Sequence, residues 1–361
     1  PYRVVDGKAV SKKNHAENDG WDVIDAEIKA KLTGTSRVRI VSHTEMRPTF
    51  SRALAAFKEK FPNTEHIMYD PVSASALLDA NERTFGVRAV PSYHFDKADV
   101  IVSFGADFLG TWISPVQYGH AYAKGRKTSN DKMSRHIQVE SGMSMTGANA
   151  DNRIMVKPSQ QGQAVLELYR ALTGSGGASD LDAETKKKIN VVAAELKRNR
   201  TRGLVISGGN NLAEQLMVNA INEAIGSYDH TITTDRWSTQ RQGSDQQLSK
   251  FADDLEAGRV DAVIVLDGAN PAWDNAFAAK IADNLGKAKL SVSMSYVPNE
   301  TTQLCQFIAP NHHYLESWGD VEAVEGHVAL QQPTITPIFA SVGRHGSRQQ
   351  GESILTWAGS S

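Results

Sequence analysis

The sequence predicts an α/β protein with two tandem, doubly wound, mostly parallel-sheet domains that are related by internal duplication. Three observations lead to this prediction. Short runs of β-branched residues alternate with amphipathic stretches along the chain, as is typical of strands that alternate with helices. The alternation starts twice. The 361 residues, of which 40% are hydrophobic, suffice for two separate cores.

The first series of elements begins with a strand at 38–42. Pro48 then opens a helix over 49–60, because proline suits the first helical turn, where its missing N–H has no partner to lose. The series continues with a strand at 66–69, a helix at 73–84 and an apolar strand at 98–104 that ends at Gly105. This order favours a parallel sheet, since parallel strands need a crossover between them.

The second series repeats the same order. It begins with a strand at 203–207, which is followed by Gly208-Gly209-Asn210 and a helix over 212–225. A short strand at 230–234, a helix at 248–257 and an apolar strand at 262–266 follow, and this last strand stops at Asp267-Gly268. The second half therefore predicts a parallel sheet like that of the first half.

Equivalent positions of the two series lie at nearly constant offsets. Ser42 and Ser207 both close a strand that precedes a helix, 207 − 42 = 165 positions apart. Gly105 and Gly268 both close an apolar strand, 268 − 105 = 163 positions apart. A third match relates two later strands, at 137–141 and 290–294. This long period indicates two duplicated domains rather than a solenoid.

The expected domain boundaries follow from the duplication. A Gly/Ser-rich run suggests a flexible linker, and Asp182 is a suitable N-cap for the helix that begins at Ala183. Pro and Gly punctuate the chain after residue 320, which favours an extended tail that packs on a neighbouring part. The expected division is an N-terminal extension at 1–36, a first α/β domain at 37–172, a linker at 173–182, a second α/β domain at 183–320 and an extended C-terminal tail at 321–361.

Composition excludes several classes of function. The formal net charge of −2 gives no reason to expect nucleic-acid binding, and no run of 18 apolar residues could span a membrane. Cys305 is the only cysteine, so the chain cannot hold an internal disulfide, a Cys-rich zinc site or a four-cysteine cluster. Its apolar neighbours indicate a buried structural thiol. The chain begins at Pro1 rather than Met, which fits a processed product or a piece of a longer polypeptide.

Four loops at the carboxyl ends of predicted strands are candidates for a ligand site, because parallel sheets bind ligands at that edge. Small residues there let backbone N–H groups approach a phosphate, although glycine after a strand is more often a simple turn. No P-loop, dinucleotide-binding glycine motif, nucleophile elbow or metal-ligand spacing is present. The candidate residues are Ser42, Gly105, Ala106, Asp107, Gly208, Gly209, Asn210, Gly268, Ala269 and Asn270.

Several strings resemble the molybdopterin oxidoreductases. Residues 263–271, with Gly268-Ala269-Asn270-Pro271, are similar to a strand and loop of that family, and 147–158 and 297–316 resemble two further segments. A closer resemblance is to the molybdopterin-like part of the large iron–sulfur subunit of bacterial alternative complex III. It rests on three strings, at 103–115, 147–151 and 331–335. The resemblance spans about Arg37 to Asp320 and implies domains like the second and third of the family.

The resemblance implies a structural module without a cofactor. The family's metal ligand and its cluster-binding cysteines have no counterpart here, and the family's "DPR" at a strand end is Glu140-Ser141-Gly142. Ser141 therefore joins the candidates for a vestigial pocket, and we expect no catalytic or metal-binding residue. The resemblance places iron–sulfur clusters and haem c elsewhere in a quinol-oxidising complex. Its other parts would be a cluster-bearing ferredoxin-like part, a multihaem cytochrome c and quinol-binding membrane subunits.

The same resemblance implies a peripheral position on the periplasmic face of the inner membrane. Two other interpretations stay open. The chain could be a fragment of an active molybdopterin-guanine-dinucleotide oxidoreductase whose remaining domains lie elsewhere. It could also be an independent nucleotide-binding α/β protein, which would be a stable monomer with a ligand at the strand ends. No catalysis by this segment alone is expected.

Overall fold

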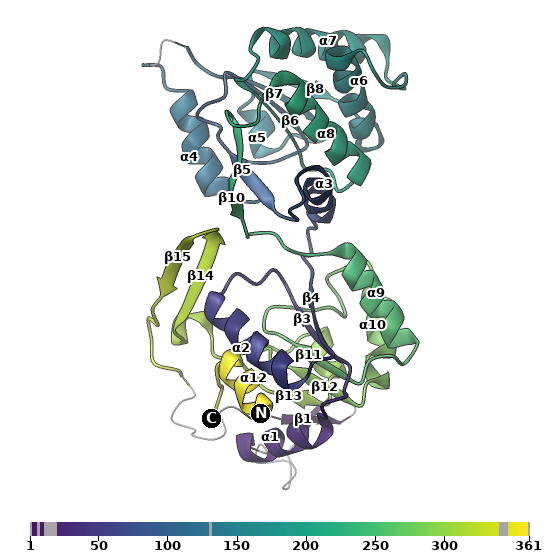
Figure 1. The fold of residues 1–361 in the computed structure, drawn as a ribbon, viewed down its shortest axis with the longest axis vertical. Coiled ribbons are helices and arrows are strands. Elements are labelled where there is room, and N and C mark those ends of the chain that lie inside the picture. The colour runs from purple at the N-terminus through teal and green to yellow at the C-terminus, as the bar shows by residue number, and fades with distance from the viewer. Residues whose placement is uncertain (1, 6–7, 11–19, 130–131, 339–345, 360–361) are drawn as a thin grey trace. The chain divides into compact units, whose positions relative to one another are not determined.

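The computed structural model describes residues 2–5, 8–10, 20–129, 132–338 and 346–359. The chain divides into two compact units (Figure 1). Unit 1 consists of residues 1–73, 243–323 and 327–361, and unit 2 consists of residues 74–242 with the three residues 324–326. Unit 2 is therefore inserted into the chain of unit 1.

Unit 1 holds a parallel sheet, helices and a C-terminal hairpin. Its elements are β1 (Tyr2–Val5), β2 (Lys8–Val10), α1 (Gly20–Lys31), β3 (Val38–Ser42), α2 (Pro48–Lys60), β4 (Thr64–Met68), α9 (Asp245–Glu256), β11 (Ala262–Val265), α10 (Ala278–Asn284), η2 (Leu285–Lys287), β12 (Leu290–Ser293), α11 (Glu300–Leu304), β13 (Phe307–Ile308), η3 (Tyr314–Glu316), β14 (Gly319–Val324), β15 (His327–Gln331) and α12 (Gln350–Ala358).

The sheet of unit 1 has the order β2-β1-β13-β12-β11-β3-β4. The five strands from β13 to β4 are parallel, and Val41 of β3 lies beside Val265 of β11. The chain runs outward from β3 to β4 on one side and from β11 through β12 to β13 on the other. The topological switch point, where such sheets bind ligands, thus lies between β3 and β11.

Both faces of this sheet are covered, which explains why its strands are continuously apolar. Val38, Ile40 and Ile264 point into a core with α1, α2 and α12. Val41 and Val263 point into a second core with α9 and α10. Burial alternates along each strand between the two cores, so the doubly wound arrangement predicted from the sequence is confirmed for this unit.

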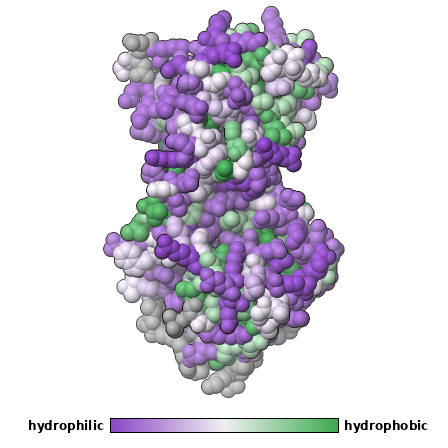
Figure 2. All heavy atoms as spheres, in the orientation of Figure 1, coloured by the Kyte–Doolittle hydropathy of each residue, from purple (hydrophilic) through white to green (hydrophobic). Residues whose placement is uncertain are grey.

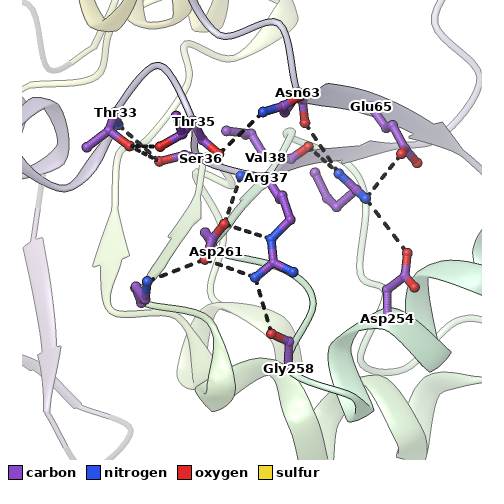
Figure 3. Close-up of polar contacts among 12 residues, drawn as sticks. Thr33, Thr35, Ser36, Arg37, Val38, Asn63, Glu65, Asp254, Gly258 and Asp261 are labelled. Atoms are coloured by element: carbon purple, nitrogen blue, oxygen red, sulfur yellow. Dashed lines mark hydrogen bonds and ion pairs between the residues drawn. The ribbon is translucent and has the colours of Figure 1, made fainter.

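A network of ion pairs connects residues at the amino ends of β3, β4 and β11 (Figure 3). Asp261, just before β11, accepts hydrogen bonds from the backbone N–H and the Nε of Arg37, each at 2.9 Å. These bonds hold the pKa of Asp261 far below its ordinary value. Arg39 extends from β3 to Glu65 at 3.1 Å and to Asp254 of α9 at 3.7 Å. The network fixes register at the sheet edge opposite the candidate ligand edge.

Unit 2 contains a smaller parallel sheet and its own helices. Its elements are α3 (Ser75–Phe85), β5 (Val90–Tyr93), β6 (Val100–Phe104), α4 (Pro115–Gly125), β7 (Arg135–Glu140), α5 (Met145–Ala148), β8 (Asn152–Met155), η1 (Pro158–Gln160), α6 (Gln161–Thr173), α7 (Ala183–Arg198), β9 (Gly203–Ser207), α8 (Leu212–Ile225) and β10 (Ile232–Ser238).

The parallel sheet of unit 2 has the order β8-β7-β6-β9. Val102 and Val205 face a core formed with α6, α7 and α8. Ile101 and Ile206 face the opposite core, which contains α3, α4 and the antiparallel pair β5 and β10. Its switch point lies between β6 and β9. The chain runs from β6 to β7 and β8 on one side of β6, whereas β9 lies on the other side of β6.

The two sheets repeat one order, and this agrees with the correspondences found in the sequence. β13-β12-β11-β3 in unit 1 matches β8-β7-β6-β9 in unit 2, strand for strand. The division of the chain differs from the expected tandem domains at 37–172 and 183–320, however. β3 pairs with β11 rather than β6, and β9 pairs with β6 rather than β11. Each sheet therefore takes strands from both halves of the sequence.

The expected linker and the two ends of the chain also have more structure than the sequence suggested. Residues 173–182 join α6 to α7 inside unit 2, and Asp182 caps α7 by accepting from the Thr185 N–H at 2.8 Å. The 1–36 extension contributes α1 to the core of unit 1. The expected extended tail at 321–361 instead includes the strands β14 and β15 and the helix α12. The strands are extended, as expected, whereas the helix α12 departs from the predicted extended tail because its nine residues are too few to show a clear helical period.

Candidate functional site

The switch point of unit 2 brings together three of the predicted residues. A side chain on Gly208 would lie 2.7 Å from the carbonyl oxygen of Gly105 and 3.0 Å from the Cα of Ala106. Gly105 itself has a φ of +62°, which a larger residue rarely adopts. The close approach of the β6 and β9 ends thus requires glycine at both positions. Backbone geometry alone therefore accounts for Gly105 and Gly208, without a ligand.

A buried carboxylate lies beside this glycine contact. Glu214, in the first turn of α8, accepts a hydrogen bond from the Ser207 hydroxyl at the end of β9. It also accepts from the Nε2 of Gln161 in α6, at 2.9 Å. A side chain on Gly209 would lie 2.4 Å from a Glu214 oxygen, and one on Gly105 would lie 2.5 Å from the Gln161 side chain. The side chains of Glu214 and Gln161 therefore fill the space next to Gly209 and Gly105.

Two more carboxylates occupy the ends of β6 and β7. Asp107 accepts from the backbone N–H of Thr146 at 3.0 Å and from its hydroxyl at 2.8 Å, so it caps the short helix α5. Glu140 accepts from the Ser144 hydroxyl and the Arg153 Nε, both at 2.7 Å. Burial alone would raise the pKa of Glu140, but these hydrogen bonds outweigh it and hold the pKa below its ordinary value.

Glu140 ends a line of buried polar side chains on one face of β7. The Tyr122 hydroxyl lies 3.2 Å from Nδ1 of His136 and donates to the Asn149 carbonyl at 3.1 Å, and Nε2 of His136 lies 3.2 Å from the Gln138 side-chain oxygen. The Gln138 amide in turn donates to Glu140 at 3.2 Å. Burial lowers the pKa of His136 to about 4, so its imidazole is neutral at pH 7. Because the Gln138 oxygen can only accept, Nε2 of His136 donates to it, and the bonds from His136 and from Gln138 both point towards the Glu140 carboxylate and stabilise its negative charge.

The switch point of unit 1 is also held by internal hydrogen bonds. The buried hydroxyl of Ser42 lies 2.8 Å from Nε2 of His66, whose pKa burial lowers to about 4. Tyr69 donates to Asp274 at 2.6 Å, and His43 contacts the other oxygen of that carboxylate at 3.0 Å. The backbone N–H of Asn270 donates to the Tyr69 hydroxyl at 3.0 Å. Burial chiefly raises the pKa of Tyr69, so its hydroxyl stays protonated as a donor.

A groove of about 850 Å³ lies in unit 1 between α2, α12 and the segment that leads into β14. A smaller cavity of about 210 Å³ adjoins it and includes Asp267, at the end of β11. Asn311 donates to Asp267 at 3.2 Å and accepts from the Gln350 N–H at 2.9 Å. Burial raises the pKa of Asp267. No sequence motif marks this site, because its walls come from segments as far apart as Arg47 and Thr356, 356 − 47 = 309 positions.

The remaining predicted residues do not converge on one ligand position. Ser141 and Gly268 are exposed, and Ala269 is buried in the core. The side chain of Asn210 accepts from the Ala76 N–H at 2.9 Å. The side chain of Asn270 accepts from Thr301 at 2.7 Å and donates to Glu300 at 2.6 Å. These polar residues therefore tie loops to helices.

Other features of the described residues fit the sequence analysis. Cys305 is buried, and burial raises the pKa of its thiol to about 12, which agrees with a structural role. His43 contacts Asp274, and Glu45 forms an ion pair with Arg47. Across the described ranges, no three His, Cys, Asp or Glu side chains are grouped as a metal site would need. Within the same ranges, no helix has both the length and the apolar character for crossing a bilayer.

No protein-family model matches this chain. Among curated proteins, it is 21% identical over 305 residues to the menaquinone reductase, molybdopterin-binding-like subunit of Nitratidesulfovibrio vulgaris. The match covers 74% of this chain and 44% of that subunit, so the chain spans less than half the length of its relative.

Two solved structures share its fold. Acetylene hydratase from Pelobacter acetylenicus has a TM-score of 0.69 at 11% identity, over 99% of this chain and 60% of that one. A chain of the formyltransferase/hydrolase complex from Methylorubrum extorquens has a TM-score of 0.61 at 14% identity, over 93% and 95%. At such identities the likeness concerns the fold alone. Together with the parallel sheets it confirms the expected α/β fold of molybdopterin-oxidoreductase type.

Proposed function

We propose that this chain is a structural module without a pterin cofactor in a membrane-associated quinone or quinol oxidoreductase. The observation that carries the proposal is the set of carboxylates at the carboxyl edges of both sheets. Glu214, Asp107 and Glu140 lie at these edges in unit 2, and Asp267 and Asp274 lie there in unit 1. The polar groups that a cofactor would need are already bound within the chain.

The start of α8 has little room for a phosphate group. A phosphate at a helix N-terminus uses the free backbone N–H groups and the positive end of the helix dipole. Here the Asn211 side chain accepts from the Glu214 N–H at 3.1 Å, and the Ser207 hydroxyl accepts from the Gly209 N–H at 3.0 Å. The Glu214 carboxylate itself supplies the negative charge. An incoming pyrophosphate would meet a like charge and few free donors.

The carboxylates at β6 and β7 have the same consequence. Asp107 follows β6 and Glu140 ends β7, and both are satisfied by hydroxyl, guanidinium or backbone donors. Removing them to admit a dianionic ligand would leave those donors unpaired in a buried setting, which costs free energy. These internal partners support an edge that serves folding rather than cofactor binding.

The quinone context comes from two likenesses. The curated relative is a subunit of a menaquinone reductase, and several strings of this chain resemble the iron–sulfur subunit of alternative complex III. We infer a place in a respiratory complex of the latter kind, on the periplasmic face of the membrane. Its partners there are a cluster-bearing ferredoxin-like part, a multihaem cytochrome c and quinol-binding membrane subunits. The chain holds these parts in register and carries no redox centre itself.

The decisive measurement is elemental and pterin analysis of the assembly purified with this chain. Molybdenum and tungsten by mass spectrometry, and fluorescent pterin after oxidative extraction, are expected below stoichiometric amounts. A molybdopterin enzyme purified in parallel controls for loss during extraction. Stoichiometric molybdenum or tungsten with pterin would instead establish the active-enzyme interpretation.

The composition of the same preparation tests the finer part of the proposal. Peptide mass spectrometry and haem absorbance are expected to find a multihaem cytochrome c and a ferredoxin-like part with the chain. Protease added to the outside of intact spheroplasts is expected to degrade the chain, as a periplasmic position requires. A chain that purifies alone as a monomer with a bound nucleotide would support the independent-binder alternative.

A further inference from the structure

The exposed apolar side chains of unit 2 are mostly methionines. Seven large hydrophobic residues of this unit are prominently exposed, and four of them are methionine, although the unit has only five methionines. All phenylalanines that the structure describes are, by contrast, buried or half-buried. Figure 2 shows a largely hydrophilic face of unit 2, in purple, with apolar atoms in green between the polar ones. The exposed methionines are Met133, Met143, Met145 and Met155.

Three of these methionines lie around Glu140, at the carboxyl ends of β7 and β8. Met155, the last residue of β8, pairs in register with Glu140, the last residue of β7. Ser144 lies between Met143 and Met145, and its N–H and hydroxyl donate to the Glu140 carboxylate at 3.3 and 2.7 Å. The exposed fractions are 73% for Met143, 60% for Met145 and 70% for Met155. We call these three residues the edge methionines.

The side chains of the edge methionines do not hold this part of unit 2 together. The Nε of Arg153 donates to Glu140 at 2.7 Å, and the Ser144 hydroxyl caps α5 by accepting from the Gly147 N–H at 2.9 Å. Among the residues that the structure describes, the hydrophobic cores of unit 2 include no edge methionine. A chemical change confined to these thioethers therefore leaves the hydrogen bonds and the cores intact.

An exposed thioether reacts with hydroperoxides. The sulfur lone pair attacks one oxygen of hydrogen peroxide, the O–O bond breaks, and the second oxygen leaves as water after a proton shift. Sulfur is oxidised by two electrons and the peroxide is reduced by two. The product is a methionine sulfoxide, which methionine sulfoxide reductases return to the thioether at the expense of a thiol.

Met294 of unit 1 is the opposite case, because it is fully buried in an apolar core. A sulfoxide there would place a polar oxygen among apolar side chains, and a polar group buried without a hydrogen bond costs free energy. Oxidation of the edge methionines instead adds an oxygen that water can solvate. The same reaction is thus damaging in the core and tolerated at the edge.

We propose that Met143, Met145 and Met155 form a site of reversible oxidation, where hydroperoxides transfer oxygen to the chain without loss of its fold. The site takes up to three oxygen atoms and is reset by sulfoxide reduction. The inference goes beyond the structural role proposed above and does not depend on it, since it requires only that this edge of unit 2 reaches solvent in the native assembly.

Peroxide treatment of the native assembly tests the site, with peptide mass spectrometry as the readout for each methionine. The edge methionines are expected to gain oxygen at least about tenfold faster than Met294, which reacts only when its core opens. Methionine sulfoxide reductases A and B, added with a thiol, should remove this oxygen. Edge methionines that react no faster than Met294, or oxygen that the reductases leave in place, would overturn the proposal.

A triple variant tests whether the oxidation is tolerated. Met143→Leu, Met145→Leu and Met155→Leu together should abolish the early uptake of three oxygen atoms, whereas Met133→Leu, at a 44% exposed position before β7, should leave that uptake unchanged. Wild-type chain oxidised at the edge methionines should keep its amide hydrogen exchange in β7 and α5 within about twofold of the untreated chain. Faster exchange would show damage to the fold, and undiminished early uptake by the triple variant would place the reaction elsewhere; either result contradicts the proposal.

Discussion

Glu214 is a charged side chain that is almost completely buried at the start of a helix. Its carboxylate satisfies the Ser207 hydroxyl and the Gln161 amide, and it lies near the positive end of the α8 dipole. A buried charge is tolerated only with such partners. The same residue that excludes an anionic ligand from this edge therefore also stabilises unit 2.

Replacing Glu214 by Ala should destabilise unit 2 by about 2–3 kcal/mol. The change leaves two buried donors without an acceptor, and each unmet donor costs free energy. Native-state hydrogen exchange of the α8 and β9 amides measures the loss. Glu223→Ala, at an exposed position of the same helix, is the control and should change stability by no more than about 0.5 kcal/mol. Equal effects of both variants would show that the Glu214 hydrogen bonds contribute nothing.

The two buried histidines predict a pH dependence of folding. Burial lowers the pKa of His66 and His136 from 6.5 to about 4, so in this range the unfolded chain binds more protons than the folded one. Stability is therefore lost as pH falls from about 6.5 to about 4, by about 2 kcal/mol per histidine between pH 7 and 5. Urea unfolding at both values tests this. His136→Gln should remove its share of the pH dependence, and an unchanged slope would argue against a buried neutral imidazole.

The candidate site was only partly predictable from its residues. Glu214 follows the N-cap Asn211 by three positions, a spacing typical of helix starts, so the sequence contained a signal for it. Its partner Gln161 lies 53 positions away. Asp274 lies 231 positions from His43, which it contacts. Such contacts depend on strand order, and no local pattern specifies that order.

Helices and strands with strong periodicity were predicted almost to the residue. β9 and α8 match the predicted ranges 203–207 and 212–225, because an apolar strand, an Asn cap and the C-terminal Gly226 mark their limits. The predicted strand at 230–234 instead extends over β10, to Ser238, and pairs antiparallel with β5. α12 escaped prediction because nine residues are too few for a clear period.

A buried ion pair joins Asp25 of α1 to Arg348, two residues before α12, and removing it should destabilise both helices. Asp25 of α1 accepts from both terminal nitrogens of Arg348 at 2.7 and 2.8 Å and from the Trp357 indole at 2.7 Å. Asp25→Ala leaves a buried guanidinium unpaired and should cost about 3–5 kcal/mol. Hydrogen exchange should rise in α1 and α12 first. Glu352→Ala, on the exposed side of α12, should leave exchange unchanged.

At the scale of the whole molecule, the sequence showed the duplication. It did not show that β3 and β9 each pair with a strand from the other half of the sequence. Offsets of 165 and 163 relate equivalent strands whichever sheet they join, so β3 and β9 are indistinguishable by offset. Only the pairing of β3 with β11 and of β9 with β6 shows that each sheet combines strands from both halves of the sequence, with unit 2 inserted into unit 1. The covalent order of a chain thus leaves open which copy of a repeated strand completes a sheet.

Because each sheet combines strands from both halves of the sequence, the structure predicts which fragments fold alone. Residues 74–242 contain all four strands of the unit 2 sheet, and their ends are close: Arg88 donates to the Gln242 carbonyl at 3.1 Å and to the Ser75 hydroxyl at 3.2 Å. We expect this fragment to fold alone, with cooperative urea unfolding and dispersed amide resonances.

The tandem fragments 37–172 and 183–320 are the matched comparison. The first lacks β9 and β11, and the second lacks β3 and β6, so each loses the central neighbour of its own strands and exposes apolar strand faces. Both should aggregate or show collapsed amide resonances, since unpaired apolar edges associate. Well-dispersed spectra from the two tandem fragments, together with an unfolded 74–242, would mean that the sheets assemble within each half and that the strand exchange is not part of the native fold.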